Sequence, residues 1–289
     1  MTSDEFDAWL TQPAQTRRPL VMGVLNVTPD SFSDGGRFQD PQVALEHAQA
    51  MVRAGADWID IGGESTRPGS QPTPAQEQLR RILPVIRAVR AALSTLVSID
   101  TTRGEVAEAA LDAGADLVND ISAGRDDPAM LPLVARRNAA IILMHMQGTP
   151  ATMQISPTYR DVTAEVAQFL IQRRDTAVAA GIDSRRILLD PGLGFGKTLS
   201  HNLQLLNQTA TLAALGHPLV VGPSRKGFVS EVTGQAAPDQ RLFGTAAAVA
   251  WAVTNGAAVV RVHDVGPIAQ ILRMVHAIQV AKNADFLKD

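Results

Sequence analysis

The sequence predicts a single-domain α/β protein with the fold of a (β/α)8 TIM barrel. Eight short apolar segments of strand length alternate with stretches of helical periodicity along the 289 residues. No linker-like, low-complexity or charge-rich segment interrupts them, so residues 1–289 are expected to form one domain. Near-continuous apolar strands with helical crossovers are typical of parallel sheets. A doubly wound open sheet is the alternative, but eight regular units favour closure into a barrel.

A short repeated turn supports a repeating β/α unit. Residues 54–57 and 113–116 both read Ala-Gly-Ala-Asp, and both stand between a predicted helix and a predicted strand. Residues 255–258 are a looser copy. The glycine ends a helix and the next strand follows at once, as in the tight αβ turns of such folds.

The chain opens with a segment expected to lie outside the repeat. Residues 1–19 are polar, carry Asp4 and Glu5, and lack an apolar signal core, so they are interpreted as a polar N-terminal extension. The first strand, 20–26, ends on a polar residue and runs into a loop rich in Pro, Asp, Ser and Gly. A strand that opens into such a loop commonly presents functional residues.

The elements that follow have recognisable boundaries. Asp40 is the predicted N-cap of a helix that Gly55 ends. A second helix is expected over about 74–93, and Thr102 and Glu105 have capping-box spacing for the helix after the third strand. The seven remaining strands are expected at 58–61, 96–100, 117–119, 140–145, 187–190, 218–222 and 258–263.

Composition and charge exclude several classes of protein. A net charge of −3 argues against a nucleic-acid-binding protein with a broad basic surface. The absence of cysteine excludes disulfides, thiolate metal sites and cysteine nucleophiles. No apolar run approaches the roughly 20 residues of a membrane-spanning helix. A soluble, cytoplasmic protein is therefore expected.

Polar residues stand where the expected strands end. In a (β/α)8 barrel these ends meet at one face, where active sites lie. So many polar side chains at one face are hard to explain as caps, because buried charged groups need partners. They are Asn26, Asp60, Asp100, Asn119, His145, Asp190, Arg261 and His263, with Ser224, Arg225 and Lys226 after the seventh strand.

One part of this set suits a flat heterocycle. Asp100, Asn119 and Asp190 offer carboxylate and amide oxygens for a ring with several N–H groups, because a carboxylate can accept two parallel N–H bonds. Lys226 offers a donor for a ring carbonyl. A simple ion pair between Asp190 and Lys226 is the alternative interpretation.

The other part suits an anion. Arg261 and His263 are alternate residues of the last strand, so their side chains point the same way. Asn26 follows the adjacent first strand, and barrels frequently bind phosphate near strands seven and eight. Asn26 is also expected to help hold Mg²⁺, which keeps several waters and binds through phosphate oxygens. The sequence thus predicts one cavity with an acidic wall for a ring and a cationic wall for an anion.

One glycine-rich segment is misleading. Residues 192–198, Gly-Leu-Gly-Phe-Gly-Lys-Thr, resemble a phosphate-binding P-loop, but that motif needs four residues between its first glycine and Gly-Lys-Thr. The segment is interpreted instead as a loop that lets Asp190 and Phe195 approach the ligand. The sequence has no nucleophile elbow and no His-Glu-x-x-His zinc pattern.

Seven motifs, in chain order, resemble those of the dihydropteroate synthase family of the folate pathway. Together they span nearly the whole chain, although residues 229–240 carry no usable motif. The motifs are NVTPDSFSDGG at 26–36, GGESTRPG at 62–69, SIDT at 98–101, NDIS at 119–122, DPGLGFGK at 190–197, SRK at 224–226 and RVH at 261–263.

The resemblance implies a transferase and a role for each matching position. It implies that 6-hydroxymethyl-7,8-dihydropterin pyrophosphate reacts with p-aminobenzoate through a dissociative pterin cation, giving 7,8-dihydropteroate and pyrophosphate. The implied catalytic residues are Lys226, Asp190, Arg261 and His263. The implied pterin site adds Asp100, Asn119, Met144, Ile121 and Gly222 to Asp190 and Lys226. The implied p-aminobenzoate pocket is Thr66, Arg67, Pro68, Phe195 and Ser224, closed by Phe32, Ser33 and Asp34, and Asn26, Arg261 and His263 would bind pyrophosphate with Mg²⁺ at Asn26.

Two other functions and a homodimer are compatible with the fold. A pterin-binding methyltransferase has no use for a pyrophosphate site, so Arg261 and His263 speak against it. A non-catalytic pterin-binding paralogue would not need the intact anion site. The family resemblance also implies a homodimer, through the Ala-rich helix around 245–255, although that helix would pack equally well inside the barrel's own shell.

Overall fold

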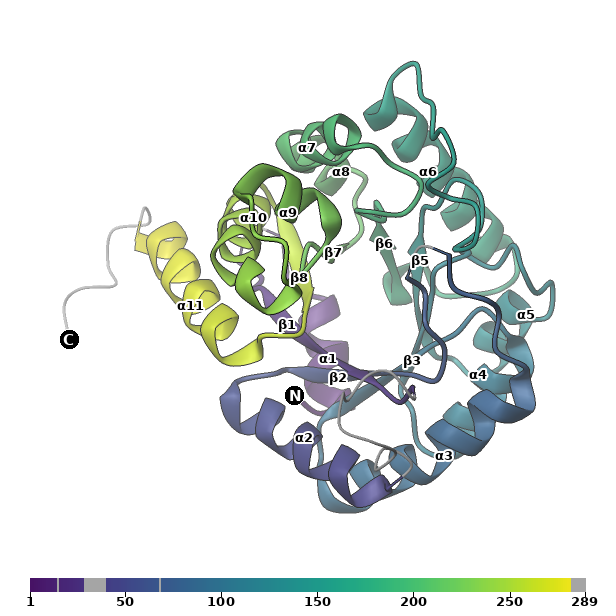
Figure 1. The fold of residues 1–289 in the computed structure, drawn as a ribbon. Helices are drawn as coiled ribbons and strands as arrows, with labels where there is room; N and C mark the ends of the chain where they lie inside the picture. Colours follow the sequence, from purple (N-terminus) through teal and green to yellow (C-terminus); the bar gives the residue numbers. More distant parts are fainter. Residues whose placement is uncertain (15, 29–39, 68, 282–289) are drawn as a thin grey trace.

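The computed structural model describes residues 1–14, 16–28, 40–67 and 69–281. Eight parallel strands form a closed barrel in the order β1 to β8, ringed by helices, so the expected (β/α)8 barrel is confirmed (Figure 1). The strands are β1 (Leu20–Asn26), β2 (Trp58–Gly62), β3 (Leu96–Asp100), β4 (Leu117–Asp120), β5 (Ala140–Met144), β6 (Ile187–Asp190), β7 (Leu219–Val221) and β8 (Ala257–Val262).

Helices cover the outside of this barrel. They are α2 (Pro41–Ala54), α3 (Ala75–Ala92), α4 (Gly104–Asp112), α5 (Met130–Arg136), α6 (Val162–Ala179), α7 (Leu199–Asn207), α8 (Thr209–Ala213), α9 (Gly227–Thr233), α10 (Leu242–Thr254) and α11 (Val265–Ala281). Short 3₁₀ turns, Ser184–Arg186 and Pro238–Arg241, precede β6 and α10. Among the described residues, none of the helices combines the length and apolarity that crossing a bilayer requires.

The predicted helix ends at the αβ turns are confirmed. Asp40 caps α2 by accepting a hydrogen bond from the backbone N–H of Gln42 at 2.9 Å. Gly55, Gly114 and Gly256 have φ of 107°, 109° and 99°, so all three occupy the left-handed region that favours glycine. Each reverses the chain directly into the next strand, as the repeated turn predicts.

The predicted capping box of α4 is wrong. The helix begins at Gly104, and its N-cap residue Arg103 makes no side-chain cap bond. Asp127 instead accepts a hydrogen bond from the Gly104 N–H at 2.6 Å. The acceptor comes from the following β/α unit, because packing of that loop brings a carboxylate to the exposed N–H groups.

Alternation along the strands decides which side chains enter the barrel. Residues two apart on a strand share a face. The interior cluster begins with Trp58, Leu96 and Leu117 near the starts of β2, β3 and β4. Two positions further along the same face, these strands carry Asp60, Ser98 and Asn119, and β3 ends two positions later with Asp100. The barrel is therefore apolar at the amino ends of its strands and polar at their carboxyl ends.

The N-terminal segment corrects the expectation of a polar extension. Residues Ser3–Leu10 form helix α1, which lies behind the ring of strands in Figure 1. Its Phe6 and Trp9 are buried and belong to the interior cluster, with Phe6 packing edge-on against Trp58 at a centroid distance of 5.7 Å. The segment looks polar because its acidic residues stand before and between Phe6 and Trp9 in the sequence. In a helix, residues three to four apart share a face, so Phe6 and Trp9 form one apolar side. Helix α1 thus closes the amino end of the barrel.

Removing the Trp9 side chain should destabilise the whole barrel. Trp9 is 2% exposed and donates its indole N–H to the Arg18 carbonyl at 2.8 Å. We expect Trp9→Ala to lower the free energy of unfolding by about 3–5 kcal/mol, as for other buried aromatic truncations. Chemical denaturation would measure it. Asp4→Ala, on the exposed face of α1, should change it by about 0.5 kcal/mol or less, and equal effects of the two variants would contradict the role of α1 as a plug.

Candidate active site

A cavity of about 1030 Å³ opens at the carboxyl ends of the strands. Every site residue that the family resemblance implies and the structure describes lines it, whereas Asp60 and His145 of the strand-end set do not. The implied residues that line it are Asn26, Thr66, Arg67, Asp100, Asn119, Ile121, Met144, Asp190, Phe195, Gly222, Ser224, Lys226, Arg261 and His263. The remaining four, Phe32, Ser33, Asp34 and Pro68, lie outside the described residues.

The acidic and cationic walls expected from the sequence are joined in the structure. The Arg261 guanidinium donates to Asp60 at 2.7 Å and to Asp100 at 2.8 Å. Asp60 is fully buried and also accepts from Ser98 Oγ and, at 3.2 Å, from Asn119 Nδ2. Arg261 therefore neutralises the acidic side of the cavity, and Asp60 fixes both Arg261 and Asn119.

Burial shifts the ionisation of this network. It raises the pKa of Asp100 well above the usual range of a carboxyl, and the nearby Asp60 charge acts in the same direction against the opposing effect of Arg261. The pKa of Arg261 is raised, because Asp60 and Asp100 outweigh the opposing effect of burial. The guanidinium is thus a permanent cation beside a carboxylate that is easily protonated.

Asp190 stands at the end of β6 as a separate acceptor. Its Oδ1 accepts from the Gly192 N–H at 2.6 Å. Burial raises the pKa of Asp190 to about 6, against the lowering effects of that bond and of Lys226. Between these two described residues no ion pair within 4.0 Å forms, so the alternative of a simple Asp190–Lys226 salt bridge is wrong. The second carboxylate oxygen remains available for a ligand.

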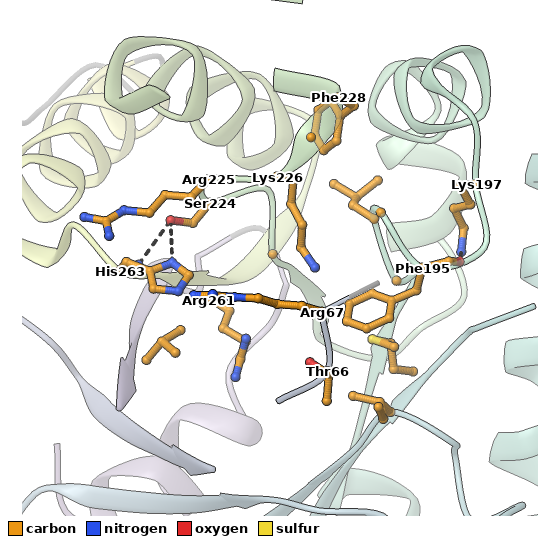
Figure 2. Close-up of a pocket in the computed structure, with 18 of the residues that line it drawn as sticks. Thr66, Arg67, Phe195, Lys197, Ser224, Arg225, Lys226, Phe228, Arg261 and His263 are labelled. Atoms are coloured by element: carbon orange, nitrogen blue, oxygen red, sulfur yellow. Dashed lines mark hydrogen bonds between the residues drawn. The ribbon is translucent and has the colours of Figure 1, made fainter. Parts of the chain in front are cut away.

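Lys226 and Phe195 are in contact within the cavity lining. The Lys226 Nζ lies 3.9 Å from the centroid of the Phe195 ring, a cation–π distance (Figure 2). Burial and the Arg261 charge lower the pKa of Lys226 to about 8. Lys226 is therefore a cation at neutral pH, held by an aromatic face rather than by a carboxylate.

His263 is oriented by Ser224. The Ser224 Oγ accepts from the His263 backbone N–H at 3.1 Å and lies 3.0 Å from its ring Nδ1 (Figure 2). Burial and Arg261 lower the pKa of His263 to about 3, so the ring is neutral. A neutral imidazole carries one N–H, and the Ser224 contact admits either the hydroxyl or Nδ1 as its donor. In the tautomer in which Ser224 donates to Nδ1, Nε2 carries the ring N–H and offers a donor to an anion in the cavity.

Some functional positions were missed or misplaced from the sequence. The sequence identifies Asp60 only as a polar strand end, although it holds Arg261. It identifies Lys197 only as part of a P-loop-like segment, although Lys197 lines the cavity. Glu231 and Arg241 line it too, within or next to a segment without a recognisable motif. His145, expected at the shared face, is instead buried beneath the cavity, with its Nδ1 3.0 Å from Lys197 Nζ. A lone charge after an apolar loop was the signal that could have singled out Lys197.

Comparisons with known proteins identify the family of this chain. Residues 22–263 match the family of pterin binding enzymes. The chain is 48% identical to the dihydropteroate synthase of a Synechocystis species, with 91% of each chain covered. The Xanthomonas albilineans dihydropteroate synthase with 4-aminobenzoic acid is 46% identical (91% of this chain, 93% of that chain, TM-score 0.86). The same enzyme in complex with 7,8-dihydropteroate aligns at 43% identity (91% and 94%, TM-score 0.82). The chain therefore belongs to the pterin binding enzyme family and, within it, to the dihydropteroate synthases, which are transferases.

Proposed function

We propose that the barrel cavity joins 6-hydroxymethyl-7,8-dihydropterin pyrophosphate to p-aminobenzoate, releasing pyrophosphate. The observation that carries this proposal is the shared cavity, in which ring-binding acceptors and anion-binding donors line one space. The related structures with 4-aminobenzoic acid and 7,8-dihydropteroate support both organic ligands. A methyltransferase would leave the donors of Arg261 and His263 without a use.

The pterin ring is assigned to the acidic side. Asp190 accepts ring N–H groups with its free oxygen, and Asn119 and Asp100 supply further polar contacts. Lys226 donates to the ring carbonyl. Met144, Ile121 and Gly222 line the slot, where apolar walls exclude water from these hydrogen bonds.

The pyrophosphate is assigned to Asn26, Arg261 and His263. Arg261 and, with its ring hydrogen on Nε2, His263 are donors for the negative charge that grows on the leaving oxygen. Among the described residues no cluster of three or more His, Asp or Glu could hold a metal ion. One amide oxygen, from Asn26, still fits Mg²⁺, which prefers waters and phosphate oxygens to an all-protein cage. When bound, Mg²⁺ would neutralise part of the pyrophosphate charge.

The reaction needs no protein nucleophile. The C–O bond between the pterin methylene and pyrophosphate breaks, and the electron pair leaves with the pyrophosphate. The resulting positive charge spreads into the ring beside the Asp190 carboxylate. The p-aminobenzoate nitrogen, in a pocket assigned to Thr66, Arg67, Phe195 and Ser224, forms the new C–N bond and loses a proton. Pro68 is proposed to belong to the same pocket, and Phe32, Ser33 and Asp34 are proposed to close it against water.

Arylamine-dependent release of pyrophosphate tests the function. Purified protein would be mixed with Mg²⁺, the pterin pyrophosphate and p-aminobenzoate, with each omitted in turn. We expect release only from the complete mixture and 7,8-dihydropteroate as the organic product. Release that ignores the arylamine would indicate a hydrolase. Binding of the pterin without any release would indicate the non-catalytic paralogue.

Pterin affinity should depend on pH in a bell-shaped manner. Asp190, with a pKa of about 6, faces Lys226, Lys197 and Arg261, and must be ionised to accept the ring N–H groups. Affinity should therefore fall as pH drops through about 6, approaching tenfold per unit. It should fall again above about 8, where Lys226 loses its charge. Measuring the Kd of the pterin between about pH 4.5 and about pH 9.5 would cover both limbs, because this range brackets the two pKa values. The Lys226→Met variant should lack the alkaline limb, and its persistence would contradict the role of Lys226.

A homodimer is proposed through helix α10. Thr245, Val249 and Val253 pack inside the barrel's shell, whereas Phe243 and Trp251 on the outer side are 86% and 52% exposed. A helix that is apolar on both sides needs a partner on each, and a second copy of this chain supplies one. Sedimentation should give a dimer that Phe243→Glu converts to a monomer, while Val178→Glu on α6 should leave it dimeric. A wild-type monomer would refute the assembly. The cytoplasmic location stays a prediction of the sequence.

A further inference from the structure

The loop between β6 and α7 is packed tightly against the segment that follows β5. Gly192 and Gly196 have φ of +66° and +63°, which side chains rarely adopt. A Cβ at Gly192 would collide with the His145 carbonyl oxygen, and one at Gly196 with the Gln147 carbonyl oxygen. Main chain therefore lies directly on main chain at both ends of the loop, and Phe195 lies between these two contacts.

A buried lysine spans this loop, and burial lowers its pKa to about 7. Lys197 is 3% exposed, and its Nζ donates to the Phe195 carbonyl at 2.9 Å. Its second partner is His145 Nδ1 at 3.0 Å. Burial and Lys197 lower the pKa of His145 to about 2, so the imidazole is neutral and Nδ1 accepts. Lys197 thus links the main chain at Phe195 to the end of β5.

The loop centre is also the surface on which Lys226 rests. The Phe195 ring lies 3.9 Å from Lys226 Nζ, and a Cβ at Gly194 would lie only 3.0 Å from Lys226 Cδ. Figure 2 shows Lys197 and Lys226 on opposite sides of Phe195, whose ring faces Lys226. A shift of the Phe195 backbone would move the ring that borders the proposed arylamine pocket.

We propose that Lys197 is a positioning residue that holds Phe195 for the arylamine. Burying a lysine amine is costly whether or not it is charged, and an apolar side chain of similar length would fill the space without that cost. An apolar side chain could not hold the Phe195 carbonyl. The identity of the ligand rests on the proposed function, whereas the link between Lys197 and the pose of Phe195 does not.

A double-mutant cycle between Lys197 and Phe195 tests this role. The Kd of 4-aminobenzoate would be measured by calorimetry, with pterin and pyrophosphate present, for wild type, Lys197→Met, Phe195→Ala and the double variant. We expect Lys197→Met to raise the Kd of 4-aminobenzoate about tenfold in the wild-type background and less than about twofold in the Phe195→Ala background. The Kd of the pterin alone should change less than about twofold. Equal effects in both backgrounds, or an equal loss of pterin affinity, would overturn the proposal.

Hydrogen exchange supplies a readout without any substrate. The amides of Gly194 and Phe195 donate to Asn202 Oδ1 at 2.7 Å and to the Gly192 carbonyl at 3.1 Å. Lys197→Met should speed their exchange at least about tenfold, and unchanged exchange would refute the positioning role. Arg90→Met is the matched control, because Arg90 holds the carbonyls of Gly114 and Thr95 at the other end of the barrel. It should alter neither loop exchange nor arylamine affinity, and a wild type that fails to bind 4-aminobenzoate would count against the proposed function alone.

Discussion

Asp190→Ala should abolish useful pterin binding, raising the Kd of the pterin by roughly 100- to 1000-fold. The side chain is 5% exposed, and one of its oxygens is already occupied by the Gly192 N–H. Its other oxygen carries the charge-assisted bonds to the ring, and the loss of such a buried partner costs about 3–4 kcal/mol. Isothermal titration with the pterin pyrophosphate would measure the change.

The Asp190→Asn variant separates charge from shape. It keeps the side-chain volume and an acceptor for Gly192 but removes the negative charge, so we expect an intermediate loss of affinity. Its pterin affinity should also fall less steeply as pH drops through 6, since the group with a pKa of about 6 is gone and only Asp100, whose pKa burial also raises, still titrates. A pterin Kd within a factor of about three of wild type for Asp190→Ala would remove Asp190 from the ring site.

Arg261→Ala should lower kcat by roughly 100- to 1000-fold, the usual effect of removing one preorganised donor to a developing negative charge. Its guanidinium is held in place by two carboxylates, at 2.7 Å from Asp60 and 2.8 Å from Asp100. Pterin affinity should fall by no more than about tenfold, because Asp190 remains. Single-turnover release of pyrophosphate at saturating pterin would measure the chemical step.

Arg185→Ala controls for the loss of a positive charge. Arg185 is exposed, pairs with Asp183 in the turn that precedes β6, and does not line the cavity. The Arg185→Ala variant should therefore leave kcat unchanged. The Arg261→Ala variant should lose a little pterin affinity through Asp100. Without the neighbouring cation the pKa of Asp100 should rise further, so more of this carboxyl is protonated. The proposed division of labour fails if Arg261→Ala and Asp190→Ala weaken pterin binding equally.

The fold was predictable because its signals are local. Each strand is a short apolar run, and each αβ turn needs a glycine that the sequence displays, as at Gly55 and Gly114. The α1 plug and the cap of α4 were not predictable in the same way. Trp9 matters because it meets Trp58 and its neighbours inside the barrel, and Asp127 because its loop folds back onto Gly104.

The sequence by itself determined many of the polar residues that face the cavity. Side chains alternate along a strand, and strands of a parallel barrel end at one face, so polar residues at those ends line a common space. Only the tertiary structure decided how their charges are shared. Arg261 on β8 neutralises Asp60 on β2 and Asp100 on β3, 201 and 161 residues away in the chain. The ion pairs of a buried site depend on distances across the closed barrel, and no pattern along one strand contains those distances.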